Sequence, residues 1–335
     1  MDKIQKLERL AAVARLYYEE DRNQSEIAGM FGISRPMVSK LLKEAKELGV
    51  VTIRIAVPGN GAPGETEDVL SRLRQRYGLL GGELVQDRGG DVATNQAVAE
   101  AGIAFLERLA GNGRKRFGIG WGHIIGELVG RIEKRSQPVN LGESICPLIG
   151  NGGAGLKNYH SNELVRVVGE HSQSEPEFIY TPAYMTSEQD LKRTMDLENY
   201  HEILLSWRRL EVALVNIGNF PSVPDFASKA RYGDLLVKER AVGRILNYFV
   251  GEDGHVLASD TDYAVQIPLS LLGKVPHVVG ICSANTNPRA LGAALRTGYI
   301  RDLIAPERIA AQLMLSGKCW NSKSRGDALT GNNRP

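Results

Sequence analysis

The sequence of 335 residues is poor in cysteine, has no long apolar segment and carries a net charge of only +2. Its three cysteines, Cys146, Cys282 and Cys319, form no Cys-x-x-Cys pair, which argues against a disulfide framework or a zinc site. No apolar run approaches the roughly 20 residues of a membrane-spanning helix. The first residues, MDKIQKLERL, lack the apolar core of a signal peptide. The composition therefore predicts a soluble, cytoplasmic protein without a membrane partner.

Motifs of the common catalytic and nucleotide-binding sites are also missing. The sequence contains no Gly-x-Ser-x-Gly and no His-Glu-x-x-His. The stretch FGIGWGHIIG, residues 117–126, has His123 where a dinucleotide fingerprint needs its third glycine. The stretch GNGGAGLKN has Leu156 where a P-loop needs lysine. We therefore expect no cofactor, no metal and no catalytic residues, although a constellation assembled from distant residues stays open.

The small basic excess is confined to the start of the chain. Residues 1–57 contain ten basic and eight acidic side chains, whereas the remaining residues contain 31 of each. A local excess of this size permits a nucleic-acid partner but does not require one.

The stretch NQSEIAGMFGISRPMVSKLLKEAKELGVV, residues 23–51, has the spacing of a helix-turn-helix. Gly32 supplies the tight turn, Ser34 is placed to cap the next helix and Pro36 falls in its first turn. One face of that helix is apolar, so the opposite face is left for a DNA groove. The candidate DNA-contacting residues are Arg35, Met37, Ser39, Lys40 and Lys43. The alternative is a plain helical hairpin with a basic, solvated face.

The rest of the chain alternates between strand and helix patterns, which predicts a parallel sheet covered by helices on both faces. Residues 245–259 differ, because they alternate around Asp253-Gly254 and predict an inserted hairpin. The expected strands lie near 82–86, 115–119, 143–148, 177–181, 211–217, 277–281 and 301–304. The expected domains are a DNA-binding domain (1–57), a linker (58–65), an effector-binding and oligomerisation domain (66–316) and a polar tail (317–335).

Three strand ends carry glycines or hydroxyl groups, and strand ends are where a parallel sheet binds ligands. They are GIGWG, GNGG and the segment 283–289, where polar side chains precede a helix that Pro288 opens. The alternatives are glycines that merely turn the chain, and a well-capped helix with a surface arginine.

The motifs and their order resemble the SorC family of bacterial transcriptional regulators, which is related to the DeoR type. The stretches that carry the resemblance are SEIAGMFGISRPMVSKLLKEAKELGVV, GIGWG, PLIGNGG, AVGRILNYFVGEDG and ALGAALRTGYIRDLIAPERIAAQLM. The resemblance implies an α/β protein with a helix-turn-helix domain and a larger, Rossmann-like parallel-sheet domain similar to sugar-phosphate isomerases and deaminases. It also implies control of a carbohydrate operon, double-stranded operator DNA as a partner, and a homotetramer or homodimer.

The resemblance further implies that a small carbohydrate-derived effector binds at the strand ends. The candidate effector-binding residues are Gly120, Trp121, Gly122, His123, Asn151, Gly152, Gly153, Asn216, Gly218, Arg244, Ser283, Asn285, Thr286 and Arg289.

Arg244 stands where the family often has aspartate, and this departure bears on the effector. A guanidinium in place of a carboxylate favours an anionic group. The exchange points from the usual sugar phosphate toward a sugar acid, a glycoside or a sugar alcohol derivative, with a sugar phosphate left open. The alternative is that Arg244 points to solvent or pairs with a local acid such as Glu239.

The competing function is a sugar-phosphate isomerase- or deaminase-like enzyme with an attached DNA-binding domain. The fold that the resemblance implies permits it, but fold does not fix function. Because no catalytic set is visible, the sequence favours a regulator that senses its effector without changing it.

Overall fold

The computed structural model describes residues 3–18, 22–47, 50–51, 63–111, 115–152, 157–222 and 231–315. The chain divides into two compact units, Met1–Asn60 and Gly61–Pro335. The tail predicted at 317–335 and most of the linker predicted at 58–65 lie outside the described residues. The first helix of the second unit begins at Pro63, within the predicted linker.

The first unit contains three helices, α1 (Lys3–Tyr18), α2 (Gln24–Phe31) and α3 (Arg35–Glu47). Asn23 and Glu26 form a capping box at the start of α2. The Asn23 side chain accepts from the Glu26 N–H at 3.0 Å, and the Glu26 carboxylate accepts from the Asn23 N–H at 3.0 Å. Gly32 ends α2 in the left-handed conformation with φ 60°, which allows the sharp turn into α3. This is the helix-turn-helix that the sequence predicts.

The core of the first unit comes from one face of each helix. The buried residues are Leu10, Val13 and Ala14 of α1, Ile27 and Ala28 of α2, and Val38, Leu41, Leu42 and Ala45 of α3. The apolar face that the sequence predicts for α3 is therefore the buried one.

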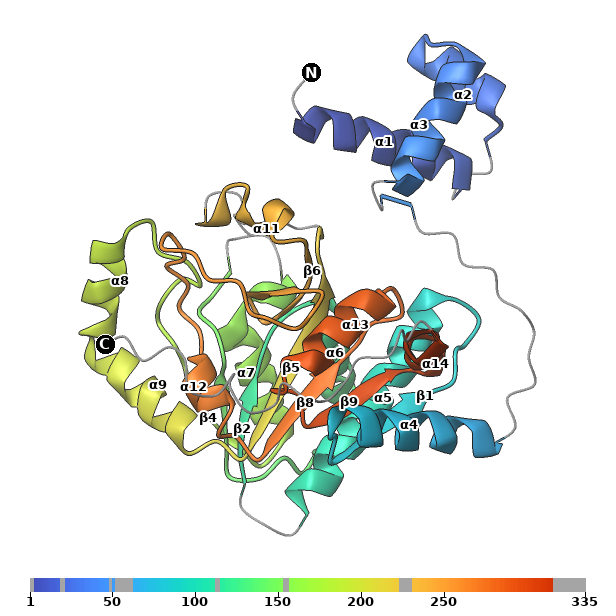
Figure 1. Ribbon diagram of the computed structural model, residues 1–335. Helices are drawn as coiled ribbons and strands as arrows, with labels where there is room; N and C mark the ends of the chain where they lie inside the picture. Colours follow the sequence, from blue (N-terminus) through green and yellow to red (C-terminus); the bar gives the residue numbers. More distant parts are fainter. Residues whose placement is uncertain are drawn as a thin grey trace. The chain divides into compact units, whose positions relative to one another are not determined.

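The second unit is built on a mostly parallel sheet (Figure 1). Its main path has the order β1-β9-β8-β5-β2-β3-β4, and the antiparallel strand β6 joins β5 to β7. The strands are β1 (Gly81–Val85), β2 (Arg116–Ile119), β3 (Ser144–Pro147), β4 (Glu175–Pro176), β5 (Val212–Asn219), β6 (Ala241–Ile245), β7 (Tyr248–Gly251), β8 (His277–Ile281) and β9 (Asp302–Pro306).

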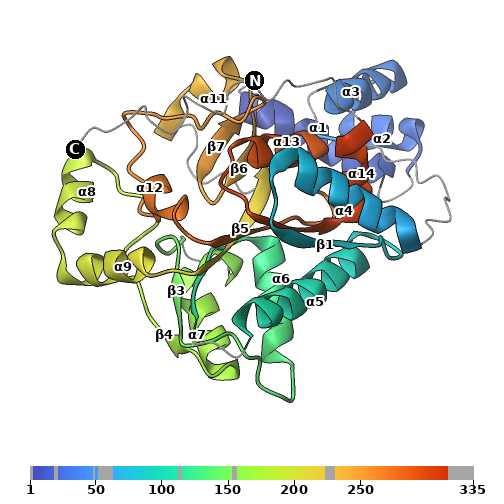
Figure 2. The ribbon, with the colours of Figure 1, turned by 60° about the horizontal axis from the view of Figure 1, so that its bottom comes forward.

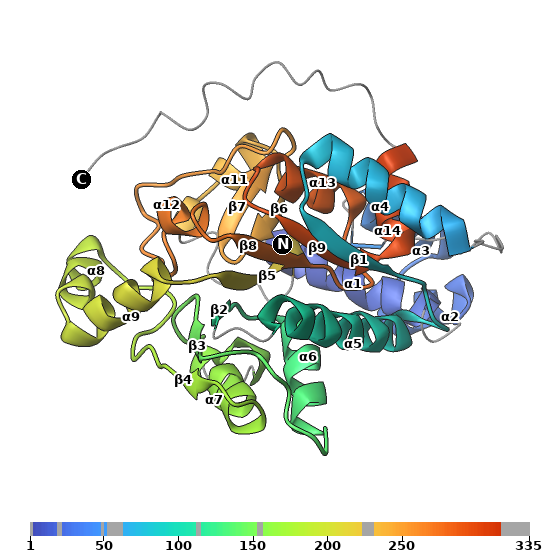
Figure 3. The ribbon, with the colours of Figure 1, turned by 90° about the horizontal axis from the view of Figure 1, so that it is seen from below.

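Helices cover both faces of this sheet. Figure 3 shows α5, α6 and α7 on one side and α4, α13 and α14 on the other. The helices are α4 (Pro63–Tyr77), α5 (Asp91–Ala110), α6 (His123–Glu133), α7 (Ser161–His171), α8 (Glu188–Met195), α9 (Glu198–Arg208), α11 (Leu235–Lys238), α12 (Leu269–Leu272), α13 (Pro288–Arg296) and α14 (Glu307–Leu315), with a 3-10 turn η1 (Lys157–Tyr159).

Each face of the sheet has a hydrophobic core, and the central strand β5 supplies both. Val212 and Leu214 belong to the core under α5, α6 and α7, whereas Ala213 and Val215 belong to the core under α4, α9, α13 and α14. A strand buried on both faces is a continuous apolar run, as expected for a parallel sheet. The predicted α/β fold is confirmed.

The inserted hairpin is present, but its main turn lies elsewhere than predicted. β6 and β7 pair antiparallel around Leu246 and Asn247, and they lie beside α11 and α13 (Figure 2). Asp253 and Gly254 form a second, smaller turn, which the isolated bridge between Val250 and Val256 closes. The Asp-Gly pair is the stronger sequence signal for a turn, but the pairing of Ile245 with Ile217 of β5 fixes the first turn.

The prediction of a strand near 177–181 was wrong, because the pairing of β4 with β3 ends at Pro176. Side chains satisfy the backbone beyond that point. The Ile179 N–H donates to Asn162 Oδ1 at 3.0 Å, and the Tyr180 N–H donates to Asn199 Oδ1 at 3.0 Å. Side-chain acceptors thus take the place of a neighbouring strand.

Candidate functional site

The exposed face of α3 carries the five predicted DNA-contacting side chains. Arg35, Met37, Ser39, Lys40 and Lys43 are all exposed. They alternate with the buried core positions of the same helix, so the helix presents a polar and basic surface. This is the arrangement in which a recognition helix enters a major groove of about 12 Å.

The glycine-rich loop lies between β2 and α6, at the carboxyl end of the sheet. The Gly120 N–H donates to Leu214 O at 2.8 Å, and the Gly122 N–H donates to Asn158 O at 2.9 Å. Gly122 has φ 118° and ψ 172°, a conformation that essentially only glycine adopts, and directly precedes α6. The first-turn N–H groups of α6 have no acceptor within the helix. The loop therefore positions a helix N-terminus at the strand ends.

Trp121, between these two glycines, is the centre of an aromatic cluster. Its side chain is fully buried. Its ring lies 5.5 Å from the ring of Tyr159 and 6.4 Å from the ring of Tyr184. Trp121 thus holds the loop in place from inside the domain.

Asn216 and Arg244 face this loop from β5 and β6. A Cβ atom on Gly122 would lie 3.2 Å from Asn216 Nδ2, so the amide packs directly against the loop. Asn216 is 8% exposed, and its Oδ1 has no hydrogen-bond partner among the described residues. Arg244 is 6% exposed and lies across Gly218, the residue with which it pairs between the strands. Its burial excludes the solvent-facing alternative.

Arg244 also affects the nearby phenol of Tyr159. Burial raises the pKa of Tyr159, and the positive charge of Arg244 acts in the opposite direction. The two side chains are therefore close enough to interact electrostatically. The structure thus brings together Gly120, Trp121, Gly122, Asn216, Gly218 and Arg244 from separate parts of the sequence, with His123 exposed at the start of α6.

The second glycine-rich loop has a largely structural geometry. Asn151 donates to Ile179 O at 2.9 Å and accepts from the Asn162 N–H at 3.1 Å, so its amide ties two loops together. Gly152 packs against Trp121, because a Cβ at Gly152 would lie 3.2 Å from that ring. Gly153 lies outside the described residues.

The third predicted segment follows β8. Thr286 is buried and accepts from the Ser283 N–H at 3.0 Å, while Asn285 is exposed. Arg289 is exposed and forms an ion pair with Glu252 at 3.0 Å. Asn219 at the end of β5 contacts this segment directly, since its Nδ2 donates to Asn285 O at 2.9 Å and its Oδ1 accepts from the Asn287 N–H at 2.7 Å.

Sequence reasoning missed four side chains that line the same region. Tyr159 and Tyr184 flank Trp121, while Asn247 lies in the buried turn of the β6–β7 hairpin and its carbonyl accepts from Arg231. Tyr159 could have been suspected from its place after the glycine-rich loop. The other three have no local motif, because only the tertiary fold brings them near the strand ends.

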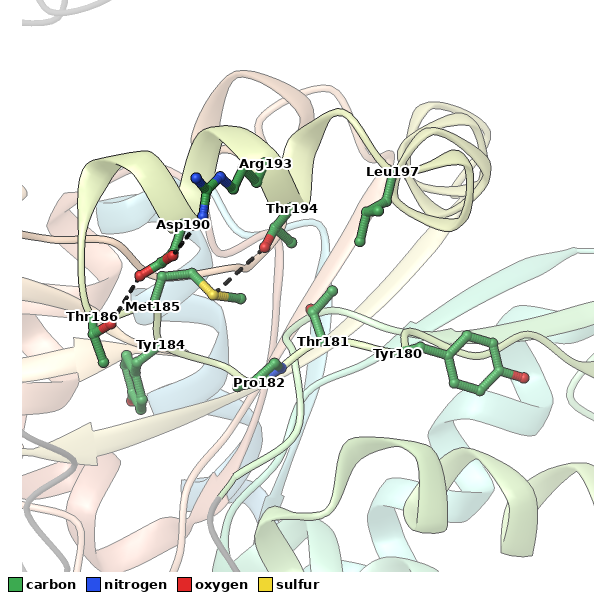
Figure 4. A pocket seen from close by; sticks show the side chains of 10 residues that line it. All are labelled: Tyr180, Thr181, Pro182, Tyr184, Met185, Thr186, Asp190, Arg193, Thr194 and Leu197. Atoms are coloured by element: carbon green, nitrogen blue, oxygen red, sulfur yellow. Dashed lines mark hydrogen bonds and ion pairs between the residues drawn. The ribbon is translucent and has the colours of Figure 1, made fainter.

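A separate surface groove of about 390 Å³ runs along α8 (Figure 4). Its walls include Thr181, Tyr184, Asp190 and Leu197. Tyr184 therefore lies between this groove and the Trp121 cluster.

The described residues contain no group of three or more His, Cys, Asp or Glu side chains placed to hold a metal ion. None of their helices is long and apolar enough to cross a membrane.

Comparison with known families matches both units. Residues 63–315 match the family described as "Putative sugar-binding domain", and residues 8–47 match the family described as "Sigma-70, region 4". The first match covers most of the second unit, and the second covers the helix-turn-helix.

Curated relatives and solved structures agree with these matches. The chain is 29% identical to the sorbitol operon regulator of Klebsiella pneumoniae, over 91% of this chain and 97% of the relative. It is 28% identical to the deoxyribonucleoside regulator of Bacillus subtilis, over 90% of this chain and 95% of the relative. The crystal structure of the full-length Klebsiella pneumoniae regulator SorC matches with a TM-score of 0.66 and 25% identity, covering 92% of this chain and 99% of that one. The chain therefore belongs to the SorC/DeoR family of sugar-responsive transcriptional regulators, with an N-terminal helix-turn-helix and a C-terminal domain of the sugar-binding type.

Proposed function

We propose that the protein binds operator DNA through the exposed face of α3 and that a small carbohydrate-derived effector controls this binding. The effector binds at the carboxyl ends of β2, β5 and β8, and the protein senses it without changing it. The regulators that this chain resembles are named for sorbitol and for deoxyribonucleosides, which supports an effector built on a polyol or a sugar.

The observation that carries the effector site is the placement of Asn216 against the N-terminus of α6. A buried amide oxygen without a protein partner costs about 1–3 kcal/mol, which a ligand hydroxyl can offset. The adjacent helix N-terminus favours a negatively charged or strongly polar ligand group. Together these groups suit a small ligand with both hydroxyl and anionic parts.

Arg244 adds a buried cation to this site, in the place where the family often has an acid. We expect it to favour an effector with an anionic group, such as a sugar acid or a phosphorylated sugar alcohol. In calorimetric titrations of the full chain, the substitution Arg244→Asp should weaken the binding of anionic compounds and leave the binding of neutral compounds unchanged. If the wild type and Arg244→Asp bind anionic compounds with equal affinity, Arg244 is not part of the site.

The DNA part of the proposal is tested with duplexes selected from random sequence by the full-length protein. Arg35→Ala should weaken binding to the selected duplex by about 1–3 kcal/mol and binding to random duplex by less, if Arg35 contacts a base. Arg22→Ala is the matched control, because it removes the same charge from an exposed position outside α3. An equal loss on both duplexes would make Arg35 a phosphate contact.

The regulatory part is tested by repeating the DNA titration with sugars, sugar phosphates, sugar acids and glycosides. A coupling free energy of about 1–3 kcal/mol corresponds to a 5–150-fold change in DNA affinity. No change in DNA affinity with any compound would refute effector control.

We also expect a homodimer or homotetramer, because paired helix-turn-helix units on half-sites about one DNA turn apart gain specificity. Sedimentation of the full chain measures its oligomeric state.

A further inference from the structure

The β6–β7 hairpin has an unusual turn, because both of its residues are fully buried. Leu246 and Asn247 are each 0% exposed, whereas connecting turns normally lie on the surface. The hairpin therefore points its tip into the domain. The Leu246 side chain reaches the glycine-rich loop, since a Cβ on Gly120 would lie 2.7 Å from Leu246 Cδ2.

Asn247 is held rigidly while its own amide has no partner. Its backbone N–H donates to Gln266 Oε1 at 3.1 Å, and its carbonyl accepts from Arg231 Nη2 at 3.3 Å. Within the described part of the chain, neither Nδ2 nor Oδ1 of its side chain forms a hydrogen bond. Leaving a donor and an acceptor buried in this way is unfavourable in the free protein, and a ligand that supplies the missing partners would offset that cost.

Arg231 presents a similar unsatisfied donor beside it. Its Nε and Nη2 bind Asp262 Oδ1 at 2.7 and 2.6 Å, which neutralises the guanidinium charge. The centre of the Tyr184 ring lies 4.6 Å from the guanidinium carbon, so the ring packs against the cation. Arg231 is 5% exposed, and its Nη1 has no partner among the described residues.

From these contacts we infer a second subsite of the effector pocket, formed by Asn247 and Arg231, that binds hydroxyl groups of the effector. The inference rests on the proposed function and names the chemistry at one end of that ligand. A neutralised arginine and an amide offer two kinds of donor and one acceptor, which matches the alternating donors and acceptors of a polyol chain. Tyr184 contacts both Arg231 and Trp121, so this subsite borders the aromatic cluster of the glycine-rich loop.

The test measures thermal unfolding and calorimetric binding of the full chain with D-glucitol, D-gluconate, D-glucitol 6-phosphate, D-ribose 5-phosphate and 2-deoxy-D-ribose 5-phosphate. Asn247→Leu removes the amide and keeps the branched shape and the number of heavy atoms of the side chain. This variant should bind the polyol that the wild type binds best with about tenfold or more lower affinity. Without ligand, it should unfold at the wild-type temperature or slightly above it. Asn247→Ala provides a second variant in case leucine does not fit.

Thr181→Val is the matched control. Its hydroxyl is also buried without a partner among the described residues, but it lines the α8 groove. This variant should keep wild-type affinity for every compound. If the wild type binds a compound and Asn247→Leu and Asn247→Ala bind it equally well, the hydroxyl subsite is refuted and the proposed function stands. If the wild type binds none of the compounds, the proposed carbohydrate effector is refuted, and the subsite with it.

Discussion

Gly122 offers the sharpest test of how the glycine-rich loop is built. At φ 118° and ψ 172°, an alanine in its place is strained by about 1–3 kcal/mol. Its Cβ would also lie 3.2 Å from Asn216 Nδ2, so the neighbouring amide would have to shift. We therefore expect Gly122→Ala to lower the unfolding temperature of the second unit by about 2–12 °C, since 1 kcal/mol corresponds to roughly 2–4 °C in a domain of this size.

Gly130 of the same helix is the matched control, because an added Cβ there meets nothing within 4 Å. Its replacement by alanine in a helix interior should stabilise by about 0.5–1 kcal/mol. Tryptophan fluorescence suits the assay, since Trp121 and Trp207 are buried in the second unit and residues 1–60 contain no tryptophan. If Gly122→Ala unfolds at the wild-type temperature or above it, the conformational argument fails.

Two further predictions concern other parts of the chain. Asn23→Ala removes the side-chain half of the α2 capping box and should destabilise the helix-turn-helix unit by about 0.5–2 kcal/mol, measured by circular dichroism during urea unfolding; wild-type stability would show that the cap contributes nothing. Burial raises the pKa of Asp302, and its contact with His277 at 2.9 Å offsets this only in part. The folded state therefore holds this proton more tightly than the unfolded state, so the contribution of Asp302 to stability is present below about pH 4 and is lost as pH rises through its raised pKa. Asp302→Asn should remove that decline from urea unfolding free energies measured across pH, and identical pH profiles would contradict the sign.

Local sequence was sufficient to predict an element wherever residues close together in the chain determine its turns and its buried face. The helix-turn-helix is such a case, since the turn at Gly32 and the buried face of α3 follow from spacing within one short segment. The parallel sheet was also predictable, because strands buried on both faces must be continuous apolar runs. The family resemblance extended this to the whole architecture.

Local sequence was insufficient to predict an element wherever contacts with residues distant in the chain determine its position. The Asp253-Gly254 signal was placed correctly as a turn but wrongly as the hairpin centre, because pairing with β5 fixes Leu246 and Asn247 there. The strand predicted near 179 is absent because asparagine side chains from two helices satisfy its backbone.

The sequence by itself determined the helix-turn-helix, the parallel-sheet unit and the glycine-bearing strand ends, because these depend on periodicity and turn chemistry within short segments. Only the tertiary structure decided which side chains meet at those strand ends. Arg244 is buried, Arg289 pairs with Glu252 at the surface, and the Asn247 amide is buried in the hairpin turn without a hydrogen-bond partner among the described residues. For these three side chains, burial and hydrogen-bond partners depend on contacts between residues far apart in the chain, which the spacing of neighbouring residues does not encode.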